Sequence, residues 1–402
     1  MKALEVLAEF VQSSGLADQP NERLDRIKLH VLDTCGAGSK PAEVRATEID
    51  DIHLSSCTTP GSVIVPTALD LASRGELRLW GEFSAAVLAG YEVLIRLGFA
   101  IRGPTVLGKG VWPTYFAAPL GSAAVACRAY RLSAAQTAGA LGTALSFCTG
   151  TSIPARSVDS SRWFAFGTAV ANGVLAANAA REGLLASADM LERYSGRIAG
   201  VRISKSRLLG GLGQRYLFDE TGCKPYPIAR QALAAVEAAR ELAAAENIKP
   251  AAITRIVVRV PGPQVRIIDH AEPPDTRMAS IASVQYQIAI ALLAPERLLD
   301  FGRTPPYLDD TVRELMAKVR VEPAPHLDKY YPDAWTGQIE IRTGRRQLRH
   351  TVLYPRGDPR NPFGWGGLAR KYPARAGLIE PVRRLRASDP ILPFCEKLDW
   401  AP

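Results

Sequence analysis

The sequence predicts a mainly α-helical protein with a second domain of the α+β class. Three observations lead to this prediction. Helical apolar spacing rich in Ala and Gly runs through residues 1–223, strand-like alternation appears only after KPYP at 224–227, and a helical tail follows the turn-rich GDPRNPFGWGG at 357–367. Helices first, and mixed helices and strands later, are typical of an all-α unit followed by an α+β unit.

The first part of the chain is predicted to form a bundle with buried central helices. Leu24, Ile27, Val31 and Leu32 follow the spacing of one helix face. The later helices carry Ala and Gly on nearly every face, and small residues let helix axes approach closely. The expected helices include residues 1–12, 23–34, 83–100, 117–132, 133–148 and 166–183.

The second part, residues 224–357, is predicted to alternate helices with strands. Ile256, Val258 and Val260 point to one side at the period of a strand. A later strand pair is expected to form a hairpin that turns around residues 343–346. The expected order is a helix at 230–246, a strand near 253–260, helices at 283–293 and 311–318, a strand near 318–322 and the hairpin within 338–357.

Charge and composition limit the classes of partner. The chain has 402 residues, 47% of them hydrophobic, and a formal net charge of +9, which favours anionic partners. The basic residues are dispersed and do not form a stripe with interleaved aromatic residues, so we expect a small carboxylate ligand and no nucleic acid. No long uncharged apolar run indicates a membrane span, and residues 1–12 have no signal-peptide pattern. We therefore expect a cytoplasmic protein.

The sequence contains no pattern typical of a metal or cofactor site. Its six cysteines are scattered without a CxxC pair or a Cys/His cluster. GPTVLGKG at 103–110 imitates a phosphate-binding loop, but Gly110 stands where Ser or Thr should bind magnesium, and the segment follows a helix instead of a strand. We expect activity without metal, nucleotide or flavin.

The polar stretch IDDIHLSSCTTPGSV at 49–63 is the main candidate for a functional loop. Asp50, Asp51 and His53 could supply an acid–base group beside small hydroxyl donors. The alternative is structural, with the acids capping a helix or turn and the histidine satisfied by hydrogen bonds. Cys57 is either a thiol nucleophile or a small packing residue.

Seven segments follow one another in order along nearly the whole chain: LHVLDTCGAG, EIDDIHLSSCTTPGSVIVP, AAVLAGYEVLIRLG, GKGVWPTYFAAPLGSAAVA, RWFAFGTAVANGVLAA, KPYPIARQALAAVEA and GDPRNPFGW. Together they resemble the MmgE/PrpD family, which includes 2-methylcitrate dehydratases, cis-aconitate decarboxylases and iminodisuccinate epimerases. The resemblance implies a helical domain (1–223 and 358–402) with an inserted α+β lid (224–357), a homodimer, and an active site between domain and lid.

Several positions depart from the family pattern. The usual D-D-T and H-P-G become Asp50-Asp51-Ile52 and Thr59-Pro60-Gly61, and Trp112 stands where G-F-H-P-T has histidine. An active-site lysine position becomes Arg162, and a histidine position on the first lid helix becomes Leu233. Fewer residues than usual separate Gly38 from Asp50, so this chain resembles a shortened member.

The resemblance and the residue types together imply a set of roles. We expect Asp51 to orient His53, which acts as acid or base, while Arg162 and Lys224 hold a substrate carboxylate. His270 is a second candidate for proton transfer. The expected substrate-binding residues are Thr58, Thr59, Trp112, Thr114, Tyr226 and Arg230.

The implied function is that of a cofactor-free lyase, either a dehydratase or a decarboxylase, or of an isomerase. Its substrate is a small di- or tricarboxylate, and the chemistry is proton transfer next to a carboxylate. The alternative is a family member without catalysis that binds an anionic metabolite or a protein partner. The altered family positions favour the alternative, and the retained acidic loop and cationic residues favour the enzyme.

Overall fold

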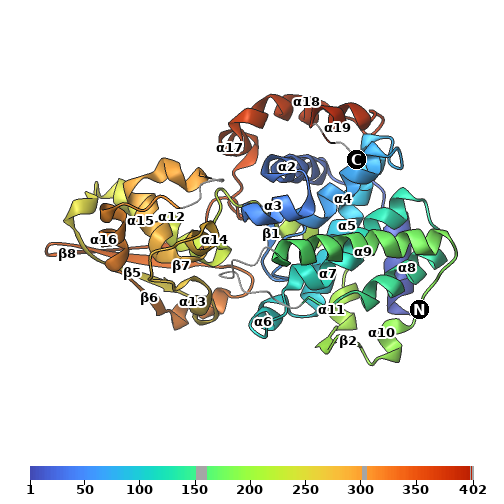
Figure 1. The fold of residues 1–402 in the computed structure, drawn as a ribbon, viewed down its shortest axis with the longest axis horizontal. Coiled ribbons are helices and arrows are strands. Elements are labelled where there is room, and N and C mark those ends of the chain that lie inside the picture. The colour runs from blue at the N-terminus through green and yellow to red at the C-terminus, as the bar shows by residue number, and fades with distance from the viewer. Residues whose placement is uncertain (151–160, 301–305, 399, 401–402) are drawn as a thin grey trace.

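The computed structural model describes residues 1–150, 161–300, 306–398 and 400. A helical part fills one side of Figure 1 and a part that contains a β-sheet fills the other. The predicted fold class is confirmed: the N-terminal part is mostly helical, and the later part has a four-stranded mixed sheet packed against helices.

The helical part is built around α5 (Trp80–Ala100) and α7 (Pro113–Ala129), both almost wholly buried. Close approach of the helices depends on glycine. A Cβ on Gly173 would lie 2.1 Å from the carbonyl oxygen of Pro119, so α9 (Ser161–Arg181) can lie against α7 only without that atom. The other helices of this part are α1 (Ala3–Ser13), α2 (Asn21–Ala37), α3 (Pro41–Thr47), α4 (Gly61–Ser73), α6 (Gly103–Leu107), α8 (Ala134–Ser146), α10 (Met190–Arg193), α11 (Lys205–Leu209) and the 3-10 turn η1 (Leu217–Glu220).

Of the helices that the structure describes, α5 alone is both long enough and apolar enough to cross a membrane. However, 94% of its most apolar window is buried inside the fold. Its apolar residues pack in the largest hydrophobic cluster, which also includes residues of α1, α4, α7 and α8. The apolarity of α5 is therefore accounted for by the core of the helical part.

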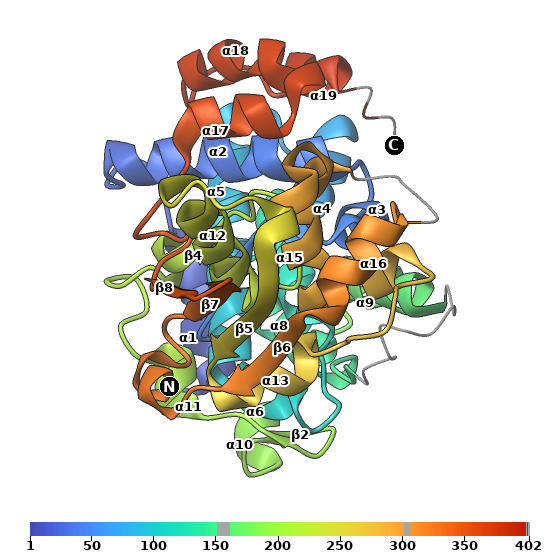
Figure 2. The same cartoon turned by 90° about the vertical axis from the view of Figure 1, so that its left-hand side faces the viewer.

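The sheet of the second part has the strand order β6-β5-β7-β8. Strands β5 (Ile253–Val260) and β6 (Val319–Pro323) are parallel, whereas β7 (Gly337–Thr343) is antiparallel to both β5 and β8 (Arg346–Val352). Ile256, Val258 and Val260 are all fully buried, as their period predicted. Helix α12 (Arg230–Ala245) packs on β5, β7 and β8 (Figure 2). The remaining elements are η2 (Pro250–Ala252), α13 (Gly262–Ile268), α14 (Arg277–Ala282), α15 (Val284–Leu293), η3 (Pro295–Leu299), α16 (Asp310–Ala317) and η4 (Pro325–Tyr330).

The C-terminal tail returns to the helical part. Helices α17 (Gly364–Lys371) and α18 (Ile379–Arg384) lie along α2, followed by α19 (Leu392–Lys397), and η5 (Pro373–Leu378) joins the first two (Figure 2). Lys371 secures this return, because its buried Nζ lies 2.5 Å from the carboxylate of Asp33 and 3.1 Å from the carbonyl oxygen of Ile49.

Two short ladders interrupt the helical part, where the sequence showed no strand alternation. Strand β1 (Ile52–His53) pairs with β4 (Thr221–Gly222), and β2 (Arg197–Ile198) pairs with β3 (Val201–Arg202). Two residues are too few to show a period of two, so these strands have no sequence signature. The first ladder brings the predicted loop at 49–63 beside the start of the second part.

Candidate active site

A cavity of about 400 Å³ separates the helical part from the sheet-containing part. We call it the cleft. Helices α3 and α9 and the segment before α4 form one wall, and α13, α14 and the start of α12 form the other. Its polar lining residues are Arg45, Glu48, Thr59, Arg162, Lys224, Arg230, Gln231, Arg266 and His270.

Trp112 organises one wall of the cleft. The guanidinium carbon of Arg162 lies 3.8 Å from the centre of the Trp112 ring, and that of Arg45 lies 4.8 Å from it. The Trp112 ring also stacks on Tyr115, with ring centroids 4.8 Å apart. Aromatic faces attract guanidinium groups, so the indole that replaces the family histidine holds two cations at the cleft wall.

Lys224 is bound in a buried ionic cluster. Its Nζ donates to the carbonyl oxygen of Glu48 at 2.6 Å and lies 3.4 Å from Oδ1 of Asp50. Arg45 contacts the same two acids, at 2.8 Å from Glu48 and 3.1 Å from Asp50. Burial lowers the pKa of Lys224, although the charges of Asp50 and Glu48 oppose the shift.

Glu48 is the carboxylate that the cleft exposes to a ligand. Burial by itself would raise its pKa, but the charges of Arg45 and Lys224 outweigh burial and hold it at about 2. Glu48 ends α3 with a left-handed backbone, φ 55°, which turns its carbonyl toward Lys224. This acid is therefore ionised at neutral pH.

Arg230 begins α12 and presents an unsatisfied donor. Its Nη2 lies 3.2 Å from Oδ2 of Asp358, whereas its Nη1 is buried without a hydrogen-bond partner. Burial lowers the pKa of Arg230 to about 10, and burial likewise lowers that of Arg162 to about 10. Both guanidinium groups stay charged, and an anion in the cleft would offset the cost of burying them.

The expectation that Asp51 orients His53 is wrong. Oδ2 of Asp51 lies 3.0 Å from Nδ1 of His30 and accepts from the Tyr91 hydroxyl at 2.7 Å. Its Oδ1 accepts from the backbone N–H of Gly61 at 2.8 Å, at the start of α4. Asp51 is 1% exposed and does not line the cleft. Its carboxylate joins α2, α4 and α5.

His53 is turned away from Asp51 by a tight hairpin. Two backbone hydrogen bonds join His53 to Thr58, and Nδ1 of the ring lies 2.9 Å from Oγ of Ser56. The other ring nitrogen lies 3.8 Å from a carboxylate oxygen of Glu220. His53 is 1% exposed, and neither it nor Thr58 lines the cleft.

The remaining predicted residues divide between the cleft and the protein interior. Thr59 lines the cleft, while Thr114 lies behind it, with the two hydroxyl oxygens 3.2 Å apart. Tyr226 donates to Glu237 within the second part and does not reach the cleft lining. The structure thus brings together Thr59, Trp112, Arg162, Lys224 and Arg230.

Four cleft residues were missed or ranked low by the sequence analysis. Arg45 and Arg266 had no motif to mark them, because an isolated charge on a helix usually faces solvent. Glu48 begins the segment EIDDIHLSSCTTPGSVIVP, but no role was assigned to it. His270 was only a second candidate, yet it alone of the five histidines lines the described cleft. Its Nε2 lies 3.1 Å from the carbonyl oxygen of Ile267.

The nucleophile hypothesis for Cys57 is not supported by its surroundings. Cys57 lies in the cleft wall, but it is 8% exposed, and burial raises the pKa of its thiol to about 12. A thiol of that pKa is protonated at neutral pH and a poor nucleophile. Cys57 is therefore best described as a packing residue.

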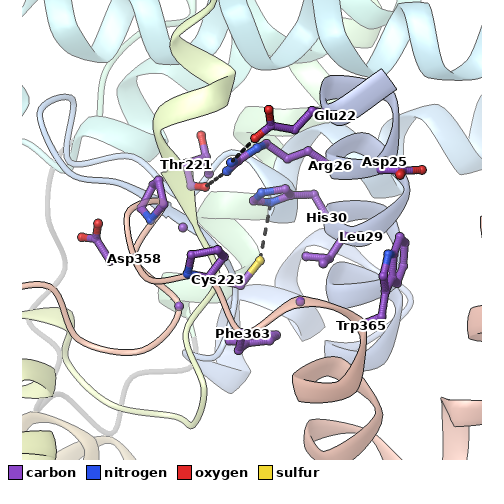
Figure 3. Close-up of a pocket in the computed structure, with 15 residues that line it drawn as sticks. Glu22, Asp25, Arg26, Leu29, His30, Thr221, Cys223, Asp358, Phe363 and Trp365 are labelled. Atoms are coloured by element: carbon purple, nitrogen blue, oxygen red, sulfur yellow. Dashed lines mark hydrogen bonds and ion pairs between the residues drawn. The ribbon is translucent and has the colours of Figure 1, made fainter. Parts of the chain in front are cut away.

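A smaller cavity of about 150 Å³ is lined by residues of α2, by β4 and Cys223, and by the segment that leads into α17 (Figure 3). Sγ of Cys223 lies 3.8 Å from Nδ1 of His30, and Arg26 reaches the carbonyl oxygen of Thr221. Burial raises the pKa of Cys223 well above its usual value, which leaves the thiol protonated. This cavity holds no activated nucleophile among its described residues.

Within the described part of the chain, no group of three or more His, Cys, Asp or Glu side chains is arranged to hold a metal ion. The polar lining of the cleft is instead dominated by cations. Guanidinium and ammonium groups around a cavity suit carboxylate ligands, which they can bind in bidentate or point-charge fashion.

Comparison with known families agrees with this geometry. The MmgE/PrpD N-terminal domain model matches residues 39–206, and the MmgE/PrpD C-terminal domain model matches residues 226–387. The chain belongs to the MmgE/PrpD family. Residues 207–225, which include Lys224, separate the two matched regions, and both regions supply lining residues to the cleft of this MmgE/PrpD protein. A search of curated proteins gives no match.

Proposed function

We propose that this MmgE/PrpD protein is a lyase or isomerase that acts on a small di- or tricarboxylate in the cleft without a cofactor. The observation that carries the proposal is the unpartnered, buried Nη1 of Arg230 in a cleft with an excess of cations. The described lining has five basic side chains, Arg45, Arg162, Lys224, Arg230 and Arg266, against one acidic side chain, Glu48. Asp50 and Asp358, which lie behind the lining, pair with Arg45, Lys224 and Arg230 and offset part of this excess. A ligand with two or three carboxylates balances the remainder.

The cations also suit the charge that this chemistry develops. Removal of a proton next to a carboxylate places negative charge on the carboxylate oxygens in the transition state. Arg162 and Arg230 are fixed before the substrate arrives, Arg162 by the Trp112 ring and Arg230 by Asp358. Fixed donors need no reorganisation during the reaction, which is the condition for electrostatic stabilisation of a transition state.

His270 is the proposed proton-transfer group. Because a carbonyl oxygen can only accept, the contact with Ile267 puts a proton on Nε2, and Nδ1 is the basic atom of the neutral ring. The backbone N–H of His270 donates to Gln285, and its carbonyl oxygen accepts from Ser283. These bonds hold the loop that carries the ring at the cleft.

One observation favours the second candidate, a binding protein without catalysis. Trp112 has no group that transfers protons, and its stacked, cation-bound ring fills the place of a family histidine. The same cationic cleft would then hold an anionic metabolite tightly and release it unchanged. Catalysis is distinguished from binding by whether a bond to a carbon atom of the ligand is broken or formed.

The test begins with a thermal-shift screen of succinate, malate, citrate and cis-aconitate. Each ligand that raises the melting temperature is then incubated with the protein in heavy water and followed by proton NMR. We expect deuterium at a carbon next to a carboxylate, or a new product. Stabilisation without exchange or product supports the binding protein, and no stabilisation by any carboxylate overturns both candidates.

Arg230→Gln tests the site directly, since it removes the charge at the cleft wall but keeps a hydrogen-bonding side chain, and Arg240→Gln is its matched control. Truncation of one member of a hydrogen-bonded charge pair with a ligand typically costs about 2–5 kcal/mol of binding free energy. Arg240→Gln changes a half-exposed arginine of the same helix that lies outside the cleft lining. It should bind carboxylates as the wild type does.

A further inference from the structure

The cleft opens into a larger space that a small carboxylate does not need. A cavity of about 610 Å³ adjoins it, and the two share lining residues, Cys57, Leu107 and Trp335 among them. We call this second space the side chamber. It lies between α6 of the helical part and α13 of the second part.

The side chamber has a different chemical character from the cleft. Its described lining has no acidic residue and one basic residue, Arg266, which it shares with the cleft. Apolar and aromatic side chains cover most of it: Pro104, Leu107, Pro263, Ile267, Tyr331 and Trp335. Such walls exclude a second charged group and favour an apolar one.

Two aromatic residues make one wall rigid. The rings of Tyr331 and Trp335 stack with an interplanar angle of 27°, and Nε1 of Trp335 donates to the carbonyl oxygen of Pro332 at 3.1 Å. Trp335 is 1% exposed, so its position is fixed by packing. A flat wall of this kind suits a planar group.

Gln264 supplies the observation that points to a ligand. It lies on α13, lines the side chamber and is 1% exposed. Both its amide nitrogen and its amide oxygen are buried without a hydrogen-bond partner. Buried polar groups are nearly always paired, because an unpaired one loses its hydration without compensation. A group with an adjacent donor and acceptor would satisfy both atoms at once.

We propose that the side chamber binds a planar, amide-bearing apolar extension of the carboxylate ligand, with Gln264 as its hydrogen-bonding partner. The carboxylates lie among the cations of the cleft, and the extension passes Ile267 and Trp335 into the chamber. The ligand is therefore a carboxylate with an aryl or acyl amide substituent, larger than a simple tricarboxylate. This inference rests on the proposed carboxylate site.

Three probes separate the contributions of charge, apolar area and amide. Succinate carries the carboxylates alone, benzylsuccinate adds an aromatic ring, and N-benzoyl-aspartate adds the ring together with an amide. Affinities are measured by calorimetry on the full-length protein. We expect N-benzoyl-aspartate to bind about tenfold or more tightly than benzylsuccinate, which corresponds to about 1.4 kcal/mol, and benzylsuccinate to bind more tightly than succinate.

Two variants test the residues. Gln264→Leu should abolish the preference for N-benzoyl-aspartate over benzylsuccinate, leave succinate binding unchanged and melt no lower than the wild type, because it removes an unpaired buried amide. Thr105→Trp, at an exposed position of the chamber lining, should fill the chamber and reduce both extended probes to the affinity of succinate.

The outcomes distinguish this inference from the proposed function. If succinate binds and neither extended probe binds more tightly, the side chamber is not a ligand site, although the carboxylate site stands. Equal affinities for the two extended probes, or a preference that persists in Gln264→Leu, overturn the role of Gln264. If no probe binds at all, the carboxylate site and the side chamber are both rejected.

Discussion

Oδ2 of Asp51 lies 3.0 Å from Nδ1 of His30, a residue 21 positions earlier in the chain. The same oxygen accepts from the hydroxyl of Tyr91, and the His30 ring packs against Phe218 with ring centroids 5.2 Å apart. Asp51 therefore belongs to a buried polar cluster that holds α2, α4 and α5 together behind the cleft. Its effect on activity is expected to be indirect, through the position of these helices.

Asp51→Asn should lower stability more than it lowers ligand affinity. The amide nitrogen of Asn cannot accept, so one of the three partners of Asp51 is left unsatisfied in the interior, at a cost of about 1–3 kcal/mol. Urea denaturation measures the change. The control is Asp70→Asn, which breaks an exposed i,i+4 pair with Arg74 and should change stability by about 0.5 kcal/mol or less. Equal effects of the two variants would contradict the structural role of Asp51.

His270→Gln and His53→Gln should have opposite consequences. Removal of the proposed proton-transfer group from the cleft should reduce turnover of a validated substrate by about 10²–10⁴-fold with little change in melting temperature. His53→Gln should leave turnover unchanged and lower the melting temperature, because it disturbs the contacts with Ser56 and Glu220. Steady-state kinetics and thermal melting of both variants decide the matter. The reverse ranking would restore His53 as the acid or base.

Glu48→Gln should destabilise the protein in a pH-dependent manner. The folded-state pKa of Glu48 is about 2, below its ordinary value of 4.5, so its charge stabilises the fold fully above about pH 4.5. That stabilisation is lost as the pH falls from 4.5 towards 2. At pH 7, loss of this partner of Arg45 and Lys224 should cost about 3–5 kcal/mol.

The measurement is the difference in unfolding free energy between wild type and Glu48→Gln from pH 7 to pH 3. We expect the difference to be constant down to about pH 4.5 and to shrink below it. Glu9→Gln, at an exposed position of α1, serves as the control and should show almost no difference at any pH. A gap that stays constant to pH 3 would refute the low pKa of Glu48.

The protein is expected to form a homodimer through its helical part. Phe164 and Leu175 lie on the same face of α9 and are 77% and 57% exposed, and Leu184, just after this helix, is 69% exposed. An apolar face of this kind is typical of a protein interface. Light scattering should give twice the chain mass of 43.4 kDa at micromolar concentration.

The double variant Phe164→Ser, Leu175→Ser should shift the dimer to monomer. Leu392→Ser changes an exposed leucine of α19, outside that helix face, and should leave the mass unchanged. A wild-type protein that scatters as a monomer would remove the prediction.

Local sequence patterns predicted the longer elements of the second part, but not the short helices α13 and α14 that line the cleft. The helix expected at 230–246 forms at Arg230–Ala245, and the hairpin expected to turn around 343–346 joins β7 to β8. These elements are recognisable because burial of one face imposes a period of 3.6 or 2 on the residues themselves. The ladder of Ile52 and His53 with Thr221 and Gly222 could not be predicted, because its partners are far apart and only two residues long.

The sequence by itself determined the fold class, the family and the cationic character of the site, since these follow from residue types and their order. Only the tertiary structure decided which charges meet. Asp51 and His53 are two positions apart, yet a hairpin to Thr58 and a contact with His30 separate their side chains. Arg45, Arg162 and Arg230 come from α3, α9 and α12 and line one cavity. Packing between the two parts of the chain places them there, and such packing leaves no periodic pattern in any single segment from which it could be predicted.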